Sequence, residues 1–114
     1  EITNLPIKQI NNIKEIEKST FFKDFNTLSL EERENLDNLN LFLEEITRKD
    51  EDVILSMHAG INRAIMSVLL EIPLQKTIIL GQNLASISEL EFKEIYGEKR
   101  WCLNLLNSTA HLKL

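Results

Sequence analysis

The sequence of 114 residues contains a single cysteine, Cys102, and no long run of apolar residues. One cysteine excludes an internal disulfide framework and is typical of a protein of the reducing cytoplasm. No segment approaches the roughly 18 consecutive apolar residues of a membrane-spanning helix, so we expect no membrane partner. The length and the 43% apolar content favour one small domain over residues 1–114, with a core of modest size.

Positive charge is also scarce, with 13 Lys and Arg against 18 Asp and Glu and a net charge of -5. A nucleic-acid-binding domain normally presents a basic face, so this balance argues against a nucleic-acid partner. The two histidines, His58 and His111, lie far apart in the sequence, and Cys102 belongs to no cluster with metal-ligand spacing. We therefore expect neither a metal site nor a cofactor.

Residues 1–28 carry weak patterns. Pro6 and the Asn11–Asn12 pair would interrupt a long helix. A short extended piece is expected at residues 7–10, followed by a loop over residues 14–17. The favoured interpretation of the next aromatic cluster is a place in the core, with a pocket wall as the alternative; its members are Phe21, Phe22 and Phe25.

A clear helix pattern begins at Ser29. Ser29 with Glu32 three residues later is typical of a capping box, in which each side chain accepts a hydrogen bond from the other's backbone. Apolar residues then recur at steps of three and four, which predicts an amphipathic helix of roughly 18 residues. These apolar positions are Leu36, Leu39, Phe42, Leu43 and Ile46.

The second half of the chain indicates strands and one more helix. Residues 53–55 form an apolar run that we interpret as a strand buried on both faces. A helical pattern follows from about Gly60, and Pro73 ends it. We predict a short strand at residues 78–80 and a hairpin from residues 85–92 and 101–105, with its turn at residues 96–99. This order favours an α/β layered fold, mostly a parallel sheet flanked by helices with a C-terminal hairpin.

His58 is the first candidate site residue. It follows the predicted strand, and ligands bind at the carboxyl ends of strands in α/β sheets. The small residues Ala59 and Gly60 let a backbone approach a ligand closely, and the first N–H groups of the next helix point to the same place. A structural histidine is the alternative. The context favours a functional His58 in a pocket for an anion, in particular a phosphoryl group.

Four motifs carry a family resemblance. VILSMHAGINRAI, over residues 53–65, resembles the second-histidine motif of the histidine phosphatase superfamily, the phosphoglycerate mutase-like group, with His58, Gly60 and Arg63 in register. LASISELEF, over residues 84–92, and LNLLNSTAHL, over residues 103–112, resemble a strand and the closing motif of the same family. LPIKQINNIKEI, over residues 5–16, resembles the stretch that ends in the family's proton-donor glutamate, which would make Glu15 the acid.

The resemblance implies phosphoryl transfer through a phosphohistidine. In this family an N-terminal Arg-His-Gly histidine attacks the phosphoryl group, and two arginines clamp its oxygens. The second histidine, here His58, would donate a hydrogen bond to the same oxygens, with Ala59 and Gly60 beside it in the phosphate site. Glu15 would protonate the leaving oxygen and later activate water, with Glu17 as the fallback. His111, in the closing motif, is expected to be a structural residue of the tail.

This sequence departs from the family pattern in one large respect. It contains no Arg-His-Gly, and none of its four arginines matches a clamp position. The chain therefore resembles the C-terminal portion of a larger histidine phosphatase domain, and we expect it to be inactive alone. We expect a phosphatase acting on a small phosphorylated metabolite, with a phosphoglycerate mutase or a non-catalytic phosphate-binding or interaction module as alternatives. A homodimer or the missing N-terminal segment would cover the open sheet edge.

Overall fold

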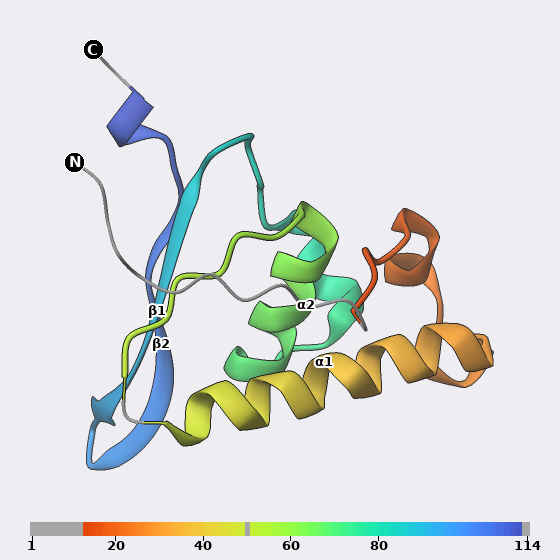
Figure 1. The fold of residues 1–114 in the computed structure, drawn as a ribbon, viewed down its shortest axis with the longest axis horizontal. Coiled ribbons are helices and arrows are strands. Elements are labelled where there is room, and N and C mark those ends of the chain that lie inside the picture. Colours follow the sequence, from red (N-terminus) through yellow and green to blue (C-terminus); the bar gives the residue numbers. More distant parts are fainter. Residues whose placement is uncertain (1–12, 50, 113–114) are drawn as a thin grey trace.

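The structure is a computed structural model that describes residues 13–49 and 51–112. Its regular elements are two helices, α1 (Leu30–Arg48) and α2 (Ala59–Leu70), and two strands, β1 (Ile87–Ile95) and β2 (Glu98–Ser108). Four short 3-10 helices accompany them: η1 (Lys18–Phe22) and η2 (Phe25–Thr27) precede α1, η3 (Leu74–Ile79) lies between α2 and β1, and η4 (Ala110–Leu112) follows β2. Helix α2 lies in the middle, with the hairpin on one side and η1 and η2 on the other, while α1 runs across the end of α2 (Figure 1).

Helix α1 confirms the predicted capping box. The Ser29 hydroxyl accepts a hydrogen bond from the Glu32 N–H at 3.1 Å, and the Glu32 carboxylate accepts one from the Ser29 N–H at 2.9 Å. These two bonds satisfy backbone donors that have no partner within the helix. The apolar spacing then places Leu39 and Leu43 in the interior, with exposed fractions of 1% and 2%.

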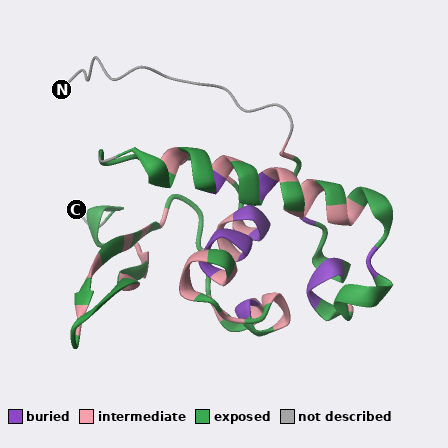
Figure 2. Cartoon of the chain, turned by 90° about the horizontal axis from the view of Figure 1, so that it is seen from below, coloured by how far each residue is buried: buried purple, intermediate pink, exposed green. Residues whose placement is uncertain are grey.

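The core lies where α1 meets α2 and the segment that precedes α1 (Figure 2). Its buried members are Ile16, Phe21, Leu39, Leu43, Ile61, Ala64 and Ile65. The predicted place in the core is right for Phe21 and wrong for Phe22 and Phe25, which are 68% and 64% exposed, whereas Phe25 lines a pocket, the alternative for this cluster. The turn of η1 points Phe21 inward and its neighbour outward, and the Phe25 ring lies instead under the guanidinium of Arg33, 5.2 Å away.

The predicted hairpin is confirmed. Strands β1 and β2 pair antiparallel, with Phe92 opposite Trp101 and their rings 5.5 Å apart. Ile95 pairs with Glu98, so the turn has two residues, Tyr96 and Gly97, and both have positive φ values of 50° and 85°. Two positive φ values match the twist of the flanking strands, and glycine adopts this conformation without a steric cost.

The two remaining strand predictions are wrong, and no parallel sheet occurs in the described part of the chain. Residues 53–55 form no regular element and pair with no described strand: Leu55 packs on the core, partly buried, while Val53 and Ile54 are 45% and 85% exposed. Residues 78–80 fall at the end of η3. Local hydrogen bonds hold them there, since the Leu80 N–H donates to the Thr77 carbonyl at 2.9 Å and Thr77 is fully buried.

Two further observations complete the fold. The loop predicted at residues 14–17 is present, whereas the extended piece predicted at residues 7–10 lies outside the described residues. Across residues 13–49 and 51–112, no helix combines the length and the apolar character that crossing a bilayer requires.

Candidate functional site

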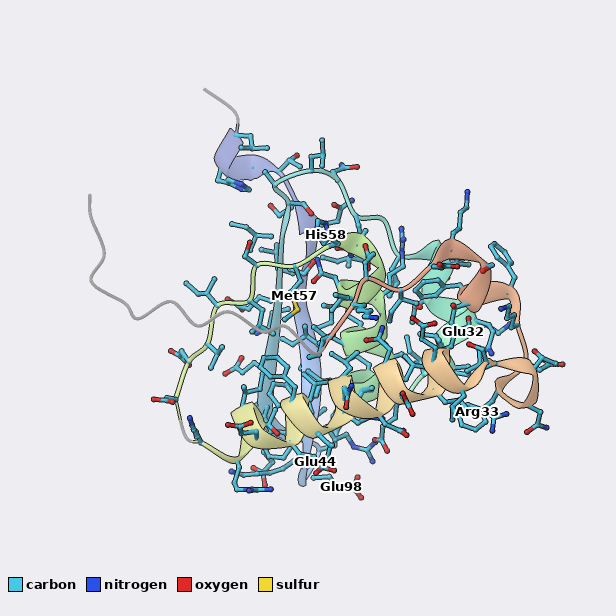
Figure 3. All side chains as sticks on the ribbon, turned by 45° about the vertical axis from the view of Figure 1, so that its right-hand side comes forward. Glu32, Arg33, Glu44, Met57, His58 and Glu98 are labelled. Atoms are coloured by element: carbon cyan, nitrogen blue, oxygen red, sulfur yellow. The ribbon has the colours of Figure 1, made fainter. Side chains whose placement is uncertain are left out.

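His58 is the N-cap residue of α2, with extended backbone angles of φ -87° and ψ 166°. Its carbonyl accepts the first hydrogen bond of the helix, from the Asn62 N–H at 3.0 Å. Side chains alternate along the extended segment that leads to the helix, so Leu55 and Met57 pack on the core and the His58 imidazole faces solvent (Figure 3). The imidazole makes no cap hydrogen bond and is therefore available to a ligand.

The Glu15 carboxylate sits on the N-terminus of α2. One oxygen, Oε2, accepts from the Gly60 N–H at 3.3 Å, and the other, Oε1, accepts from the Ile61 N–H at 3.0 Å. Glu15 and Gly60 are 45 residues apart in the sequence. Backbone N–H groups at a helix start have no partner within the helix and lie at the positive end of its dipole, so a carboxylate there is stabilised. Glu15 thus provides the cap that the His58 side chain does not.

Gly60 permits this close contact. A Cβ atom at position 60 would lie 2.6 Å from Oε1 of Glu15 and 2.7 Å from the Ile16 carbonyl oxygen. The second distance is to backbone, which cannot rotate away as a side chain can. The glycine is therefore required for the approach of the Glu15 segment to α2, rather than for a turn with positive φ.

A pocket of about 370 Å³ opens beside this contact. Arg63 reaches it from one turn into α2 and is oriented by a hydrogen bond from its Nε to the Leu80 carbonyl at 2.9 Å. Lys18 reaches it from the start of η1. The lining residues are Glu15, Ile16, Lys18, Phe21, Ala59, Gly60, Arg63 and Ile78.

The start of α2 thus holds a carboxylate beside an exposed histidine, on backbone N–H groups that suit an anion. The family model of the histidine phosphatase superfamily (branch 1) matches residues 7–109. The chain belongs to the histidine phosphatase superfamily. No curated protein and no solved structure matches it. The matched range includes Glu15, all of α2 and the whole hairpin, so the geometry described above belongs to the family domain.

The structure brings the candidate residues of this superfamily member to one place. His58, Ala59 and Gly60 are consecutive at the start of α2, and Glu15 contacts Gly60 directly. Glu17, the fallback acid, is exposed and does not line the pocket. His111 lies on η4, beyond the hairpin, and is also exposed.

The sequence did not identify Lys18 as a site residue, and it indicated no contact between Arg63 and a ligand. Arg63 stood in register with the family motif, so a helical wheel from Gly60 could have indicated that it lies one turn into α2 beside the anion position. Lys18 carried no such indication. It joins the site because the chain turns into η1 three residues after Glu15 and carries Lys18 to the pocket.

The closing motif, over residues 103–112, contacts the loop that follows Leu80. Asn107, at the end of β2, accepts a hydrogen bond from the Asn83 N–H at 2.6 Å through Oδ1 and adopts a positive φ of 52°. Its Nδ2 would lie 2.9 Å from a Cβ at Gly81. Asn107 therefore fixes the loop that follows Leu80, and Leu80 in turn orients Arg63.

The described residues contain no group of three or more His, Cys, Asp or Glu side chains that could hold a metal ion. Cys102 is a free, half-buried thiol on β2. The site itself offers one imidazole, one carboxylate, two cationic side chains and backbone N–H groups.

Proposed function

We propose that this chain takes part in phosphoryl transfer as a histidine-type phosphatase, hydrolysing the phosphomonoester of a small metabolite through a phosphohistidine. The observation that carries the proposal is the contact of Glu15 with the helix start that follows His58. Glu15 and His58 were assigned complementary roles from separate motifs, and in the fold both stand at one end of α2. Membership of the superfamily supports the same chemistry.

In this proposal His58 and the helix start hold the phosphoryl group. Charge spreads over the phosphoryl oxygens during transfer, and donors fixed in advance stabilise it without reorganisation. The exposed imidazole of His58 donates to these oxygens, and the N–H groups of Ala59 and Gly60 contribute the positive end of α2. The Glu15 carboxylate leaves the Gly60 N–H when the phosphoryl group enters, because one donor cannot serve two anions.

Glu15 then acts as the general acid. The attacking histidine, which lies outside these 114 residues in this proposal, forms an N–P bond while the P–O bond to the leaving group breaks. Glu15, which takes up a proton when its carboxylate leaves the backbone N–H groups, gives that proton to the leaving oxygen. In the second step Glu15 takes a proton from water, the water oxygen bonds to phosphorus, and the N–P bond breaks to release phosphate.

A phosphatase is favoured over a phosphoglycerate mutase by the short path from Glu15 to α1. Only the segment with η1 and η2 joins them. A dedicated mutase has to retain its intermediate and return the phosphoryl group to another hydroxyl, which calls for more chain around the substrate. The compact link supports a broad or small-metabolite specificity instead.

A non-catalytic phosphate-binding or interaction module is the alternative function, because neither His58 nor His111 matches the nucleophile motif.

The segment over residues 53–58 pairs with no strand among the described residues. We propose that the chain is the C-terminal portion of a larger domain and that a second copy or an N-terminal segment covers this open side. A monomer at high concentration in sedimentation would contradict the second-copy version. The cytoplasm is the proposed location, where Cys102 stays reduced.

The test joins the chain to an Arg-His-Gly segment of the family and measures hydrolysis of an aryl phosphate. We expect His58→Ala to lower kcat/KM by about 10²–10³, as loss of a transition-state donor does. Glu15→Gln should lower it by roughly 10²–10⁴, as loss of a general acid does. His111→Ala is the matched control and should keep the wild-type rate. Equal rates for wild type and His58→Ala would overturn the role of His58, and phosphate binding without any turnover would favour the binding module.

A further inference from the structure

The side chain of Asn35 is paired with the backbone of Lys14, the residue that precedes Glu15. Its Oδ1 accepts a hydrogen bond from the Lys14 N–H, and its Nδ2 donates one to the Lys14 carbonyl, both at 2.7 Å. Asn35 lies on the second turn of α1, 21 residues further along the chain. A carboxamide that offers one acceptor and one donor to a single residue pairs with it as a neighbouring β-strand does. The segment before Glu15 therefore has one register against α1.

The other contacts of this segment fix its register less well. The ion pair of the Lys14 Nζ with Glu31 spans 3.6 Å between side chains that are 73% and 81% exposed, so it contributes little. Ile16 is buried in the core, but apolar packing has no preferred direction. The two hydrogen bonds from Asn35 are directional, and they determine where the backbone of the next residue lies.

The Asn35 contact gains importance when a ligand arrives. Before that, the Glu15 carboxylate accepts hydrogen bonds from the N–H groups of Ile16, Gly60 and Ile61. In the proposed function the carboxylate leaves α2 when the phosphoryl group enters, so the bonds from Gly60 and Ile61 no longer hold it. The bonds from Asn35 go to the Lys14 backbone and survive this change. They keep the Glu15 backbone in place while its side chain turns to the leaving oxygen.

We propose that Asn35 is a positioning residue for the general acid Glu15, acting through the backbone of Lys14. The inference rests on the proposed function and adds to it a residue of α1 that no step of the chemistry passes through. A general acid works only within hydrogen-bond reach of the atom it protonates, and a misplacement of about 1 Å can cost on the order of 10² in rate.

Two variants separate the amide pair from the packing around it. Asn35→Ala removes both hydrogen bonds, and α1 stays formed because alanine favours a helix. Asn35→Asp has the same shape and keeps an acceptor, but a carboxylate cannot donate to the Lys14 carbonyl. Asn40→Ala and Asn40→Asp are the matched controls, because Asn40 is an exposed asparagine of the same helix that takes no part in this contact.

The first measurement follows backbone amides of the 114-residue chain by NMR. We expect the signals of Lys14, Gly60 and Ile61 to shift in both Asn35 variants and in neither Asn40 variant, while hydrogen exchange in the middle of α1 stays unchanged. Unshifted Gly60 and Ile61 amides in the Asn35 variants would overturn the inference, because Glu15 would then keep its place without Asn35.

The second measurement joins the chain to an Arg-His-Gly segment and compares methyl phosphate with phenyl phosphate. Methoxide is a much stronger base than phenoxide, so its departure depends more on a proton from Glu15. We expect Glu15→Gln and Asn35→Ala each to lower kcat/KM for methyl phosphate roughly tenfold more than for phenyl phosphate. In the Glu15→Gln background Asn35→Ala should add nothing to this difference, because both changes act on one proton transfer.

The outcomes separate this inference from the proposed function. A leaving-group effect in Glu15→Gln with an equal loss on both substrates in Asn35→Ala would overturn the role of Asn35 while the acid role of Glu15 stands. A further leaving-group effect of Asn35→Ala in the Glu15→Gln background would overturn it as well. No leaving-group effect in Glu15→Gln would overturn Glu15 as the acid, and the inference with it.

Discussion

The two sides of the molecule are stabilised in different ways. The helical side, made of α1, α2 and the segment around η1, contains the buried apolar residues of the core (Figure 2). The hairpin, described along its whole length, has no buried residue in β1 or β2, and large side chains such as Phe92 and Leu105 are 51% and 41% exposed. The helical side is therefore held by burial of apolar surface, and the hairpin by cross-strand pairs and backbone hydrogen bonds.

This difference explains where the site lies. Glu15 and Gly60 precede Ile16 and Ile61, which are 7% and 5% exposed and belong to the core cluster. The core thus sets the distance between the two segments that carry the site. A two-stranded hairpin alone is marginally stable in water and could not hold such geometry. Its contribution is the Asn107 contact to the loop behind Arg63.

The largest expected effect comes from the core itself. Leu39→Ala removes a side chain that is 1% exposed, and we expect it to lower the free energy of unfolding by about 2–5 kcal/mol. Leu105→Ala, the matched truncation on the hairpin, should cost about 1 kcal/mol or less, since Leu105 is 41% exposed. Urea unfolding measures both. Similar losses would show that the hairpin has buried apolar surface after all.

The next effect links the core to the site. Gly60→Ala places a Cβ 2.7 Å from the Ile16 carbonyl oxygen, so the Glu15 segment has to shift from α2. We expect a loss of about 1–3 kcal/mol, as overpacking of an interior contact causes, and large amide shifts at Ile61. Gly81→Ala is the control, because its Cβ would meet only the Asn107 side chain. An undisturbed Ile61 amide in Gly60→Ala would contradict the close contact.

A smaller effect is confined to the hairpin. Gly97 has a φ of 85°, and nothing lies within 4 Å of a Cβ there, so Gly97→Ala costs backbone strain alone, about 1 kcal/mol. Hydrogen exchange should quicken in β1 and β2 and stay unchanged in α1 and α2. Gly97→Asn should cost less, since asparagine adopts positive φ more readily. Faster exchange throughout the molecule would show that the two sides unfold together.

The last prediction concerns how stability changes at low pH. The hydrogen bond from the Ser29 N–H, with those from Thr20 and Lys23, lowers the pKa of Glu32 from 4.5 to about 2. Because the folded pKa is below the unfolded one, Glu32 contributes stability above pH 4.5, and this contribution is lost as the pH falls toward 2. Glu32→Gln should therefore flatten the fall in stability between these values. Glu34→Gln removes the same charge from the same turn, and a flattening of equal size there would refute the role of the Ser29 contact.

Local sequence patterns predicted the elements that local forces stabilise. The capping box and the apolar spacing predicted α1, the small residues and Pro73 predicted the limits of α2, and alternation around Gly97 predicted the hairpin. The errors fall where a distant partner decides the structure. Residues 53–55 have the composition of a buried strand, yet an extended run becomes a strand only when a neighbour pairs with it.

The sequence by itself determined the helices, the hairpin, the family and the identity of His58, Glu15 and Gly60 as candidate site residues, because each depends on residues close together in the chain. Only the tertiary structure decided that the Glu15 carboxylate caps α2 across 45 residues, and that Lys18 and Arg63 share its pocket. Packing of Ile16 and Ile61 into one core brings those segments together, and no local pattern encodes the distance between them.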